Sequence, residues 1–345
     1  MRVPRLLVAL SLLAASLPPV FDFPPQAAAG TGTDSGTSAS SQAQSTSAPV
    51  GLDLPPAVLA DVQQGLADIF HGDPDAALPI ARRLESSMPS HPMGFLLETE
   101  ARWWKIYCAS CTLRYNLIDA WSRGKLPEDD AYLALADRAI QLAEAQIAQH
   151  ETASLHVFAG MGYGLRARLQ GLRGGNLGVA RAGVKGREHF LRALELQPGL
   201  GDALTGMGLY NYLADALSPF AKMLRFFMGI PGGSKKEGIR QLETAMKTAQ
   251  LTAAEARFYL ARNLRNFDQE YARAAELVEP LVAQYPDNPS FQLLLGDLYA
   301  KLNRKQPAAL HFHAAFGLHP PDPACAARSR ELAAAALAPL EHPAP

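Results

Sequence analysis

The sequence predicts an all-α fold made of paired helices. No stretch of the chain alternates apolar and polar residues over enough positions to indicate a β-strand. One spacing of small and apolar residues recurs instead, with offsets of four and seven positions that fall on one face of an α-helix. Helix-start signals agree, because Thr252 and Glu255 form a capping box and Asn288 precedes Pro289 at a first helical position.

Each copy of the spacing has a small residue, an apolar residue four positions later and a small or apolar residue three positions after that. Four copies are followed by a helix-ending proline: Ala77, Ala81, Leu84, Pro89; Gly186, Phe190, Ala193, Pro198; Ala274, Val278, Leu281, Pro286; and Ala308, Phe312, Ala315, Pro320. Two copies lack the proline: Ala136, Ile140, Ala143 and Gly238, Leu242, Ala245. Small residues let a neighbouring helix approach closely, so each copy predicts one helix packed against a partner.

The partner helix is clearest at "FQLLLGDLYAKLN", where Leu295, Gly296 and Tyr299 precede the last copy of the spacing. The last two copies begin 34 residues apart, at Ala274 and Ala308. These residues resemble the tetratricopeptide repeat (TPR) family, whose unit is a helical hairpin of about that length. The segment "LRFFMGIPGGSKKEGIRQLETA" is also similar to a segment of exported bacterial TPR-containing proteins.

The resemblance implies a TPR-like right-handed solenoid of stacked helical hairpins, with long insertions in the middle repeats. It also implies that proteins or peptides bind along the first helix of each hairpin. On those helices the polar candidates for partner binding are Asn211, Arg262, Asn263 and Arg265.

The first 29 residues have the pattern of an export signal. Basic Arg2 and Arg5 precede an apolar run over residues 6–17, and the alanines at 27–29 offer a cleavage site. Prolines after the apolar run favour cleavage near Ala29, and the alternative is a retained anchor. We therefore expect an exported chain, periplasmic or secreted.

Three further segments follow the signal. Residues 30–50 are rich in Ser, Thr, Gly and Ala, a composition typical of a disordered linker. We expect the helical-repeat domain over residues 52–338 and a flexible tail over 339–345.

The glycine-rich stretch "RFFMGIPGGSKKEG" raises the question of a phosphate-binding loop. Gly229 and Gly233 are one residue too close for that motif, and Ser234 stands where it requires lysine. We predict a turn between two helices, with Ser234 as the cap of the second. The alternative is an anion site formed by Lys235 and Lys236 at a helix N-terminus.

The insert before this turn, residues 218–230, is an amphipathic helix with Phe226, Phe227 and Met228. We expect its apolar stripe to pack in the core. The alternatives are that it covers a groove or makes peripheral contact with a membrane or anionic surface.

Cys108 and Cys111 form a C-x-x-C motif in a helical pattern. In an oxidising compartment they predict a short disulfide or buried thiols. Redox chemistry would need a βαβ context, and zinc would need two more ligands, whereas Cys325 lies far along the chain. Of the neighbouring Trp103 and Trp104, either both pack between repeats or one lines a groove.

A basic stretch between residues 160 and 192 contains Arg166, Arg168, Arg173 and Arg181. It predicts either a solvated face or a patch that binds an acidic peptide or an anionic surface. The net charge of −1 gives no general attraction for polyanions, so we expect no nucleic-acid partner.

The sequence contains no H-E-x-x-H or G-x-S-x-G motif, so we nominate no catalytic, metal or cofactor site. These features together predict a non-catalytic scaffold of the bacterial cell envelope that binds proteins or peptides. One alternative is a ligand-binding component of an envelope or transport complex, with a pocket near residues 218–233. Another is an exported thiol oxidoreductase that uses Cys108 and Cys111.

Overall fold

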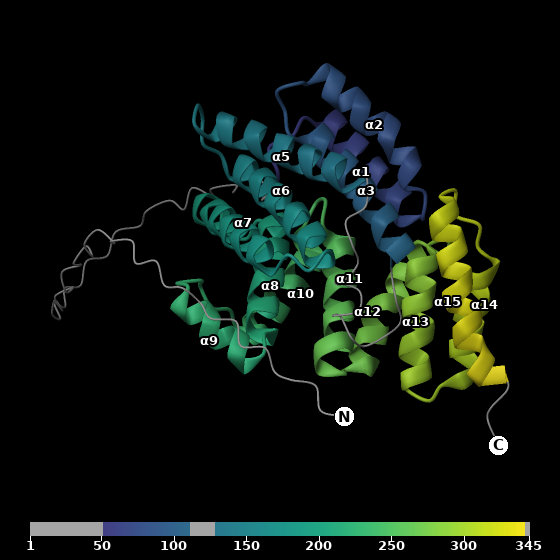
Figure 1. Cartoon of the computed structure of the whole chain (residues 1–345). Helices are drawn as coiled ribbons and strands as arrows, with labels where there is room; N and C mark the ends of the chain where they lie inside the picture. Colours follow the sequence, from purple (N-terminus) through teal and green to yellow (C-terminus); the bar gives the residue numbers. More distant parts are fainter. Residues whose placement is uncertain (1–50, 111–127, 342–345) are drawn as a thin grey trace, which may run out of the picture. The chain divides into compact units, whose positions relative to one another are not determined.

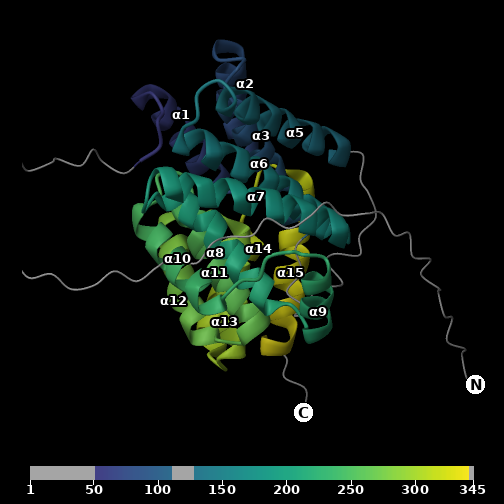
Figure 2. The ribbon, with the colours of Figure 1, turned by 90° about the vertical axis from the view of Figure 1, so that its left-hand side faces the viewer.

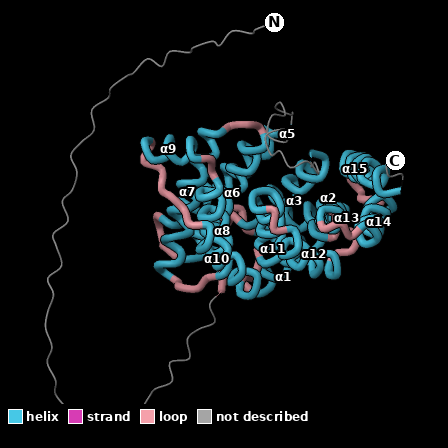
Figure 3. The backbone as a smooth tube through the Cα atoms, turned by 90° about the horizontal axis from the view of Figure 1, so that it is seen from below, coloured by secondary structure: helices cyan, strands magenta, loops and turns pink. Residues whose placement is uncertain are grey.

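A computed structural model describes residues 51–110 and 128–341, and these residues contain helices and no strand (Figure 3). The predicted signal and linker lie outside them, and so do residues 342–345 of the predicted tail. All the described residues belong to one structural unit, residues 47–345. The last helix ends at Glu341, three residues beyond the predicted end of the repeat domain.

Consecutive helices pair into six hairpins, followed by a closing helix (Figure 1). The first three hairpins are α1 (Pro56–Phe70) with α2 (Pro74–Ser87), α3 (Met93–Ser110) with α5 (Glu128–Ile147), and α6 (Ala153–Leu172) with α7 (Asn176–Leu196). The last three are α8 (Gly201–Ala216) with α10 (Lys235–Thr248), α11 (Ala253–Asn263) with α12 (Tyr271–Gln284), and α13 (Pro289–Lys301) with α14 (Lys305–Gly317). A short helix, α9 (Pro219–Phe227), interrupts the fourth hairpin, a π-helical turn (Leu264–Asp268) extends α11, and α15 (Pro323–Glu341) closes the stack.

The recurring face predicted from the sequence is buried in all six hairpins, including the two copies that lack the proline. It lies on the second helix of each hairpin. Close contact explains its small residues: a Cβ on Gly238 would lie 2.7 Å from the backbone carbonyl oxygen of Gly208 in α8. The all-α, TPR-like class is therefore confirmed, and Figure 2 shows the hairpins layered one on the next.

The extra length of the third repeat differs from the expected insertion. The stretch "GLRGGNLG" comprises the end of α6, the turn and the start of α7, and the added residues lie in the helices, which have 20 and 21 residues. The helices of the last hairpin have 13 residues each. Longer helices bury more apolar surface without a long loop between them.

Two of the predicted helix caps form and one does not. The Ser234 side chain accepts a hydrogen bond from the Glu237 amide, and that of Asn288 from the Ser290 amide. Thr252 makes no cap bond, because its hydroxyl and amide both donate to the buried Asp202 carboxylate of α8.

Helices from the two ends of the stack contact each other. The α3 helix packs against α15, and the Asn288 side-chain amide before α13 donates to the Phe70 carbonyl at the end of α1, at 2.9 Å. A disulfide joins Cys108 in α3 to Cys325 in α15. The disulfide thereby joins the second hairpin to the closing helix across 217 residues of sequence.

Candidate functional site

The face between the first helices of the hairpins is filled with aromatic side chains. The Trp104 ring in α3 lies 5.0 Å from Phe258 in α11, 5.5 Å from Phe70 in α1 and 5.8 Å from Phe291 in α13. Trp103 donates from its indole nitrogen to the Tyr259 hydroxyl at 2.9 Å. Both tryptophans are buried, at 4% and 3% exposure, so neither lines an open groove.

Arg168 lies at the centre of a buried ionic cluster beside these aromatics. It pairs with Glu100 of α3 at 2.9 Å and with Glu255 of α11, and its guanidinium lies 4.9 Å from the centre of the Tyr259 ring. Three hairpins contribute to this cluster. Its role is to satisfy buried charges at their junction.

The predicted basic patch does not exist as a free surface. Besides Arg168, Arg166 pairs with Asp137 at 2.8 Å and Arg173 pairs with Asp129 at 2.7 Å, both acids being in α5. Only Arg181 of the four is exposed. The stretch looked unbalanced in sequence because its acidic partners come from other hairpins.

The polar candidates on the first helices also make contacts within the protein. Asn211 donates to Gln241 at 2.9 Å, and Arg262 lies over the Tyr107 and Tyr259 rings. The other two candidates, Asn263 and Arg265, are both buried. Arg265 pairs with Asp297 at 2.5 Å. Asn211, Arg262 and Arg265 thus contact other helices of the stack, and Asn263 is buried.

Of the two possibilities for Cys108 and Cys111, the short disulfide between them is wrong, because Cys108 is bonded to Cys325. Cys111 lies outside the described residues. The missed partner lies near Cys108 only because the stack brings α15 against α3. Sequence distance therefore gave no signal for it, apart from there being a third cysteine.

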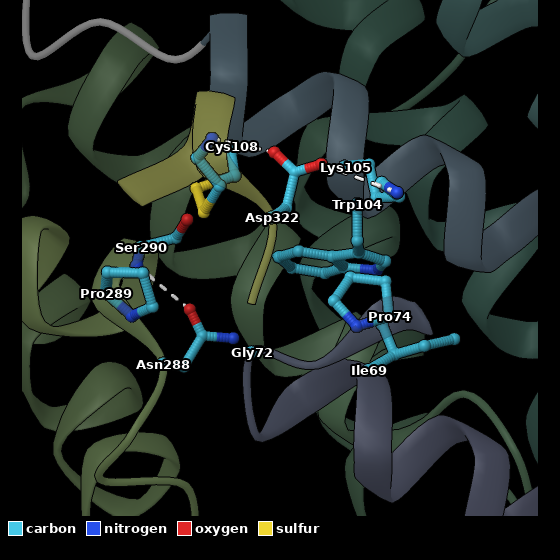
Figure 4. A pocket seen from close by; sticks show the side chains of 11 residues that line it. Ile69, Gly72, Pro74, Trp104, Lys105, Cys108, Asn288, Pro289, Ser290 and Asp322 are labelled. Atoms are coloured by element: carbon cyan, nitrogen blue, oxygen red, sulfur yellow. Dashed lines mark hydrogen bonds and ion pairs between the residues drawn. A yellow bond between two sulfur atoms is a disulfide. The ribbon is translucent and has the colours of Figure 1, made fainter. Parts of the chain in front are cut away.

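The disulfide lines a small cavity with Trp104, Asn288 and Asp322 (Figure 4). Its volume is about 10 Å³, room for about one water molecule. Beside it, the Lys105 ammonium lies 2.8 Å from Asp75 and 3.4 Å from Asp322. The cavity lies where the two ends of the stack meet, and it is too small to hold an organic ligand.

The glycine-rich stretch is a turn, as predicted. Gly229 after α9 has a φ of 64°, a backbone conformation that favours glycine, and Ser234 caps α10. The alternative anion site is already filled from within the chain. The Asp215 carboxylate accepts from the Lys235 amide at 2.8 Å, and the Lys235 ammonium pairs with Asp268.

The apolar side of α9 faces solvent, so the expected core packing is wrong. Phe226 and Phe227 are 78% and 76% exposed. Met223 and Leu224 of α9 and Met228 at its C-cap are also exposed. We call these five side chains the α9 surface.

Two contacts hold α9 in this orientation by its basic side. The Lys222 ammonium pairs with Asp215 of α8 at 2.8 Å, and the Arg225 guanidinium donates to the Pro231 carbonyl at 3.1 Å. Tyr210 donates to the same carbonyl at 2.7 Å. The helix is therefore inverted relative to an ordinary surface helix: its charged side chains are tied to the protein, whereas Phe226 and Phe227 are exposed.

No cluster of three or more His, Cys, Asp or Glu side chains suited to a metal ion occurs among residues 51–110 and 128–341. Within the same part of the chain, no helix combines the length and apolarity needed to span a bilayer.

No family model matches the sequence, and no curated protein matches it. Among solved structures, the chain is similar to one in the crystal structure of the APC/C hetero-tetramer Cut9-Hcn1, with 15% identity and a TM-score of 0.39. The match covers 77% of this chain and 48% of the other, so this chain spans about half the length of that one.

Proposed function

We propose that the protein is a non-catalytic scaffold that binds a partner protein through the α9 surface. The observation that carries this proposal is the inverted helix: a chain gains nothing in isolation by exposing Phe226 and Phe227 while tying Lys222 and Arg225 to itself. Contiguous exposed apolar side chains of this kind mark interaction sites. TPR-like folds generally serve protein–protein interactions.

The partner's chemistry follows from the segment around α9. Residues 218–236 contain Lys222, Arg225, Lys235 and Lys236 and no acidic residue. Lys236 is exposed at the edge of the segment. The complementary partner is a protein with an apolar groove that accepts the two phenylalanines and an acidic group that faces the exposed Lys236.

The export pattern of residues 1–29 supports a place in the bacterial cell envelope, which forms part of the same proposal. An oxidising compartment is also where the Cys108–Cys325 disulfide would persist.

The two alternatives drawn from the sequence have less support. A thiol oxidoreductase would need an accessible thiol at Cys108, which is buried and bonded to Cys325. A ligand pocket roofed by residues 218–233 would need Phe226 and Phe227 of α9 to face inward, and both face solvent.

The test compares three forms of the full chain: wild type, Phe226→Ser with Phe227→Ser, and a matched control in which Leu310 and Phe316 of α14 become serine. The control also removes two exposed apolar side chains, at a different place on the molecule. A protein captured from envelope extract is identified, purified and titrated against all three. We expect the α9 variant to bind at least about 100-fold more weakly, as for two interface hot spots, and the control to bind like wild type.

Three results would contradict the proposal. Equal binding by all three forms would place the contact elsewhere on the molecule. Flotation of the wild type, but not of the α9 variant, with protein-free lipid vesicles would identify a membrane as the occupant. A wild-type dimer that becomes a monomer in the α9 variant would identify a second copy.

A further inference from the structure

Two histidines meet between the helices of the third hairpin. Nδ1 of His156 in α6 lies 2.9 Å from Nδ1 of His189 in α7. His156 is buried, and His189 is covered on one side by the stacked ring of Tyr163. The other ring nitrogens each face a carboxylate: Nε2 of His156 lies 2.9 Å from Glu151, and Nε2 of His189 lies 3.5 Å from Glu144.

The carboxylates determine where the protons lie on His156. Hydrogen bonds from Arg192 and from His156 lower the pKa of Glu151 to about 2, so this group is a carboxylate and can only accept. Nε2 of His156 is therefore the donor to Glu151. In the neutral ring Nδ1 is then unprotonated and can accept a hydrogen bond.

His189 supplies the donor to that nitrogen. If Nδ1 of His189 carries the proton, its Nε2 lone pair faces the Glu144 carboxylate, which already accepts from the Tyr163 hydroxyl at 2.8 Å. One added proton, on Nε2 of His189, turns that repulsion into an ion pair and leaves the bond to His156 intact. A second added proton would place two N–H groups head to head.

The ring geometry indicates a shared proton between the two nitrogens. The ring centres are 5.1 Å apart and the two nitrogens 2.9 Å apart, so the rings point at each other nearly end-on. A metal ion would require both lone pairs to converge on a third point. No third metal-binding side chain is placed there among the described residues.

We propose that His156 and His189 form a proton-sensitive contact that holds α6 against α7 while the pair carries at most one added proton, and that loosens this hairpin when both rings are protonated. The proposal is independent of the α9 surface. The third hairpin would then respond to acidification. An exported protein experiences acidification where its surroundings are not buffered.

All the neighbouring charged and titratable groups influence the protonation of the two histidines. Glu144 of α5, Glu151 before α6 and Tyr163 of α6 surround the pair, and from α7 come Lys185 and Arg192. Burial lowers the pKa of His189 below its ordinary value, and so does the charge of His156 where that ring is protonated. The pair therefore takes up its second added proton less readily than two separate histidines of an unfolded chain, which titrate near about pH 6.5. The stabilisation that the contact provides is lost as the pH falls through the step that protonates the second ring.

The experiment uses the full chain labelled with ¹⁵N-histidine and follows the ring nitrogens by NMR from pH 8 to pH 4. Amide hydrogen exchange in α6 and α7 is measured beside it, corrected for the intrinsic effect of pH. We compare wild type with His189→Gln and with a control, His319→Gln, at an exposed histidine of the α14–α15 turn.

We expect two protonation steps separated by more than about one pH unit, as for a coupled pair. Exchange in wild-type α7 should rise about tenfold between pH 7 and pH 5 and stay flat in His189→Gln, with the His319 variant like wild type. A single step with ordinary histidine behaviour would overturn the shared proton. Two steps without a change in exchange would overturn the loosening of the hairpin.

Discussion

Two pairs of adjacent aromatic residues have opposite fates in this molecule. Trp103 and Trp104 point in different directions around α3, yet both are buried. Phe226 and Phe227, on the amphipathic helix α9, are both exposed. The sequence favours burial for both pairs, and only the first is buried.

The difference lies in the neighbours of each helix. The α3 helix packs against α1, α2, α5, α6 and α15, so every side of its C-terminal half meets another part of the stack. The α9 helix has nine residues and makes no extensive contact with another described helix. An aromatic pair is buried when the stack surrounds its helix. A pair left outside is available for a partner.

The largest expected effect is at the tryptophans. Trp104→Ala should lower the free energy of unfolding by about 3–5 kcal/mol, because it opens a cavity against three aromatic rings. Phe226→Ser should change it by less than about 0.5 kcal/mol, as for other exposed sites. Urea denaturation followed by circular dichroism measures both. If the two variants were equally destabilised, α9 would be part of the core and the comparison would fail.

Two arginines of the basic stretch, Arg168 and Arg181, allow the same comparison of a buried with an exposed position. Arg168→Ser leaves Glu100 and Glu255 buried without their partner and should cost about 3–5 kcal/mol. Arg181→Ser, at an exposed position of the same stretch, should cost less than about 0.5 kcal/mol. The denaturation midpoints of the two variants show which substitution lowers the stability more. A stable Arg168 variant would show that this stretch is a solvated face after all.

The Cys108–Cys325 disulfide joins the second hairpin to the closing helix near Trp104, and its contribution to stability can be measured. Cys325→Ser should lower the free energy of unfolding by about 2–4 kcal/mol. Cys111→Ser should leave it unchanged, because Cys108 pairs with Cys325. Thermal unfolding with and without a reductant gives the same comparison in the wild type. If Cys111→Ser were more destabilising than Cys325→Ser, Cys108 would pair with Cys111 instead.

The repeat faces could be predicted because their information is local. Residues such as Ala274 and Val278 reveal their helix by spacing alone, and even the copy at Gly238 without the proline is buried. The contacts that define the candidate site are not local. Cys325 pairs across 217 residues, and Arg168 finds its acids in two other hairpins.

The orientation of α9 was the hardest feature to predict. Its apolar stripe has the same pattern whether it faces in or out. What decides between the two is a set of polar contacts, with Asp215 seven residues before Lys222 and the Pro231 carbonyl after Arg225. An acid just before an insert whose own charges are all basic is the one sequence signal that could have suggested it.

The most direct test of the central claim places a photo-crosslinking amino acid at position 227 in α9 and, separately, at position 310 in α14, another exposed apolar site. Both forms are irradiated in cells that produce the protein. We expect one discrete protein adduct from position 227 and none of the same mass from position 310. Adducts of equal yield from both positions, or adducts to lipid alone from position 227, would contradict it.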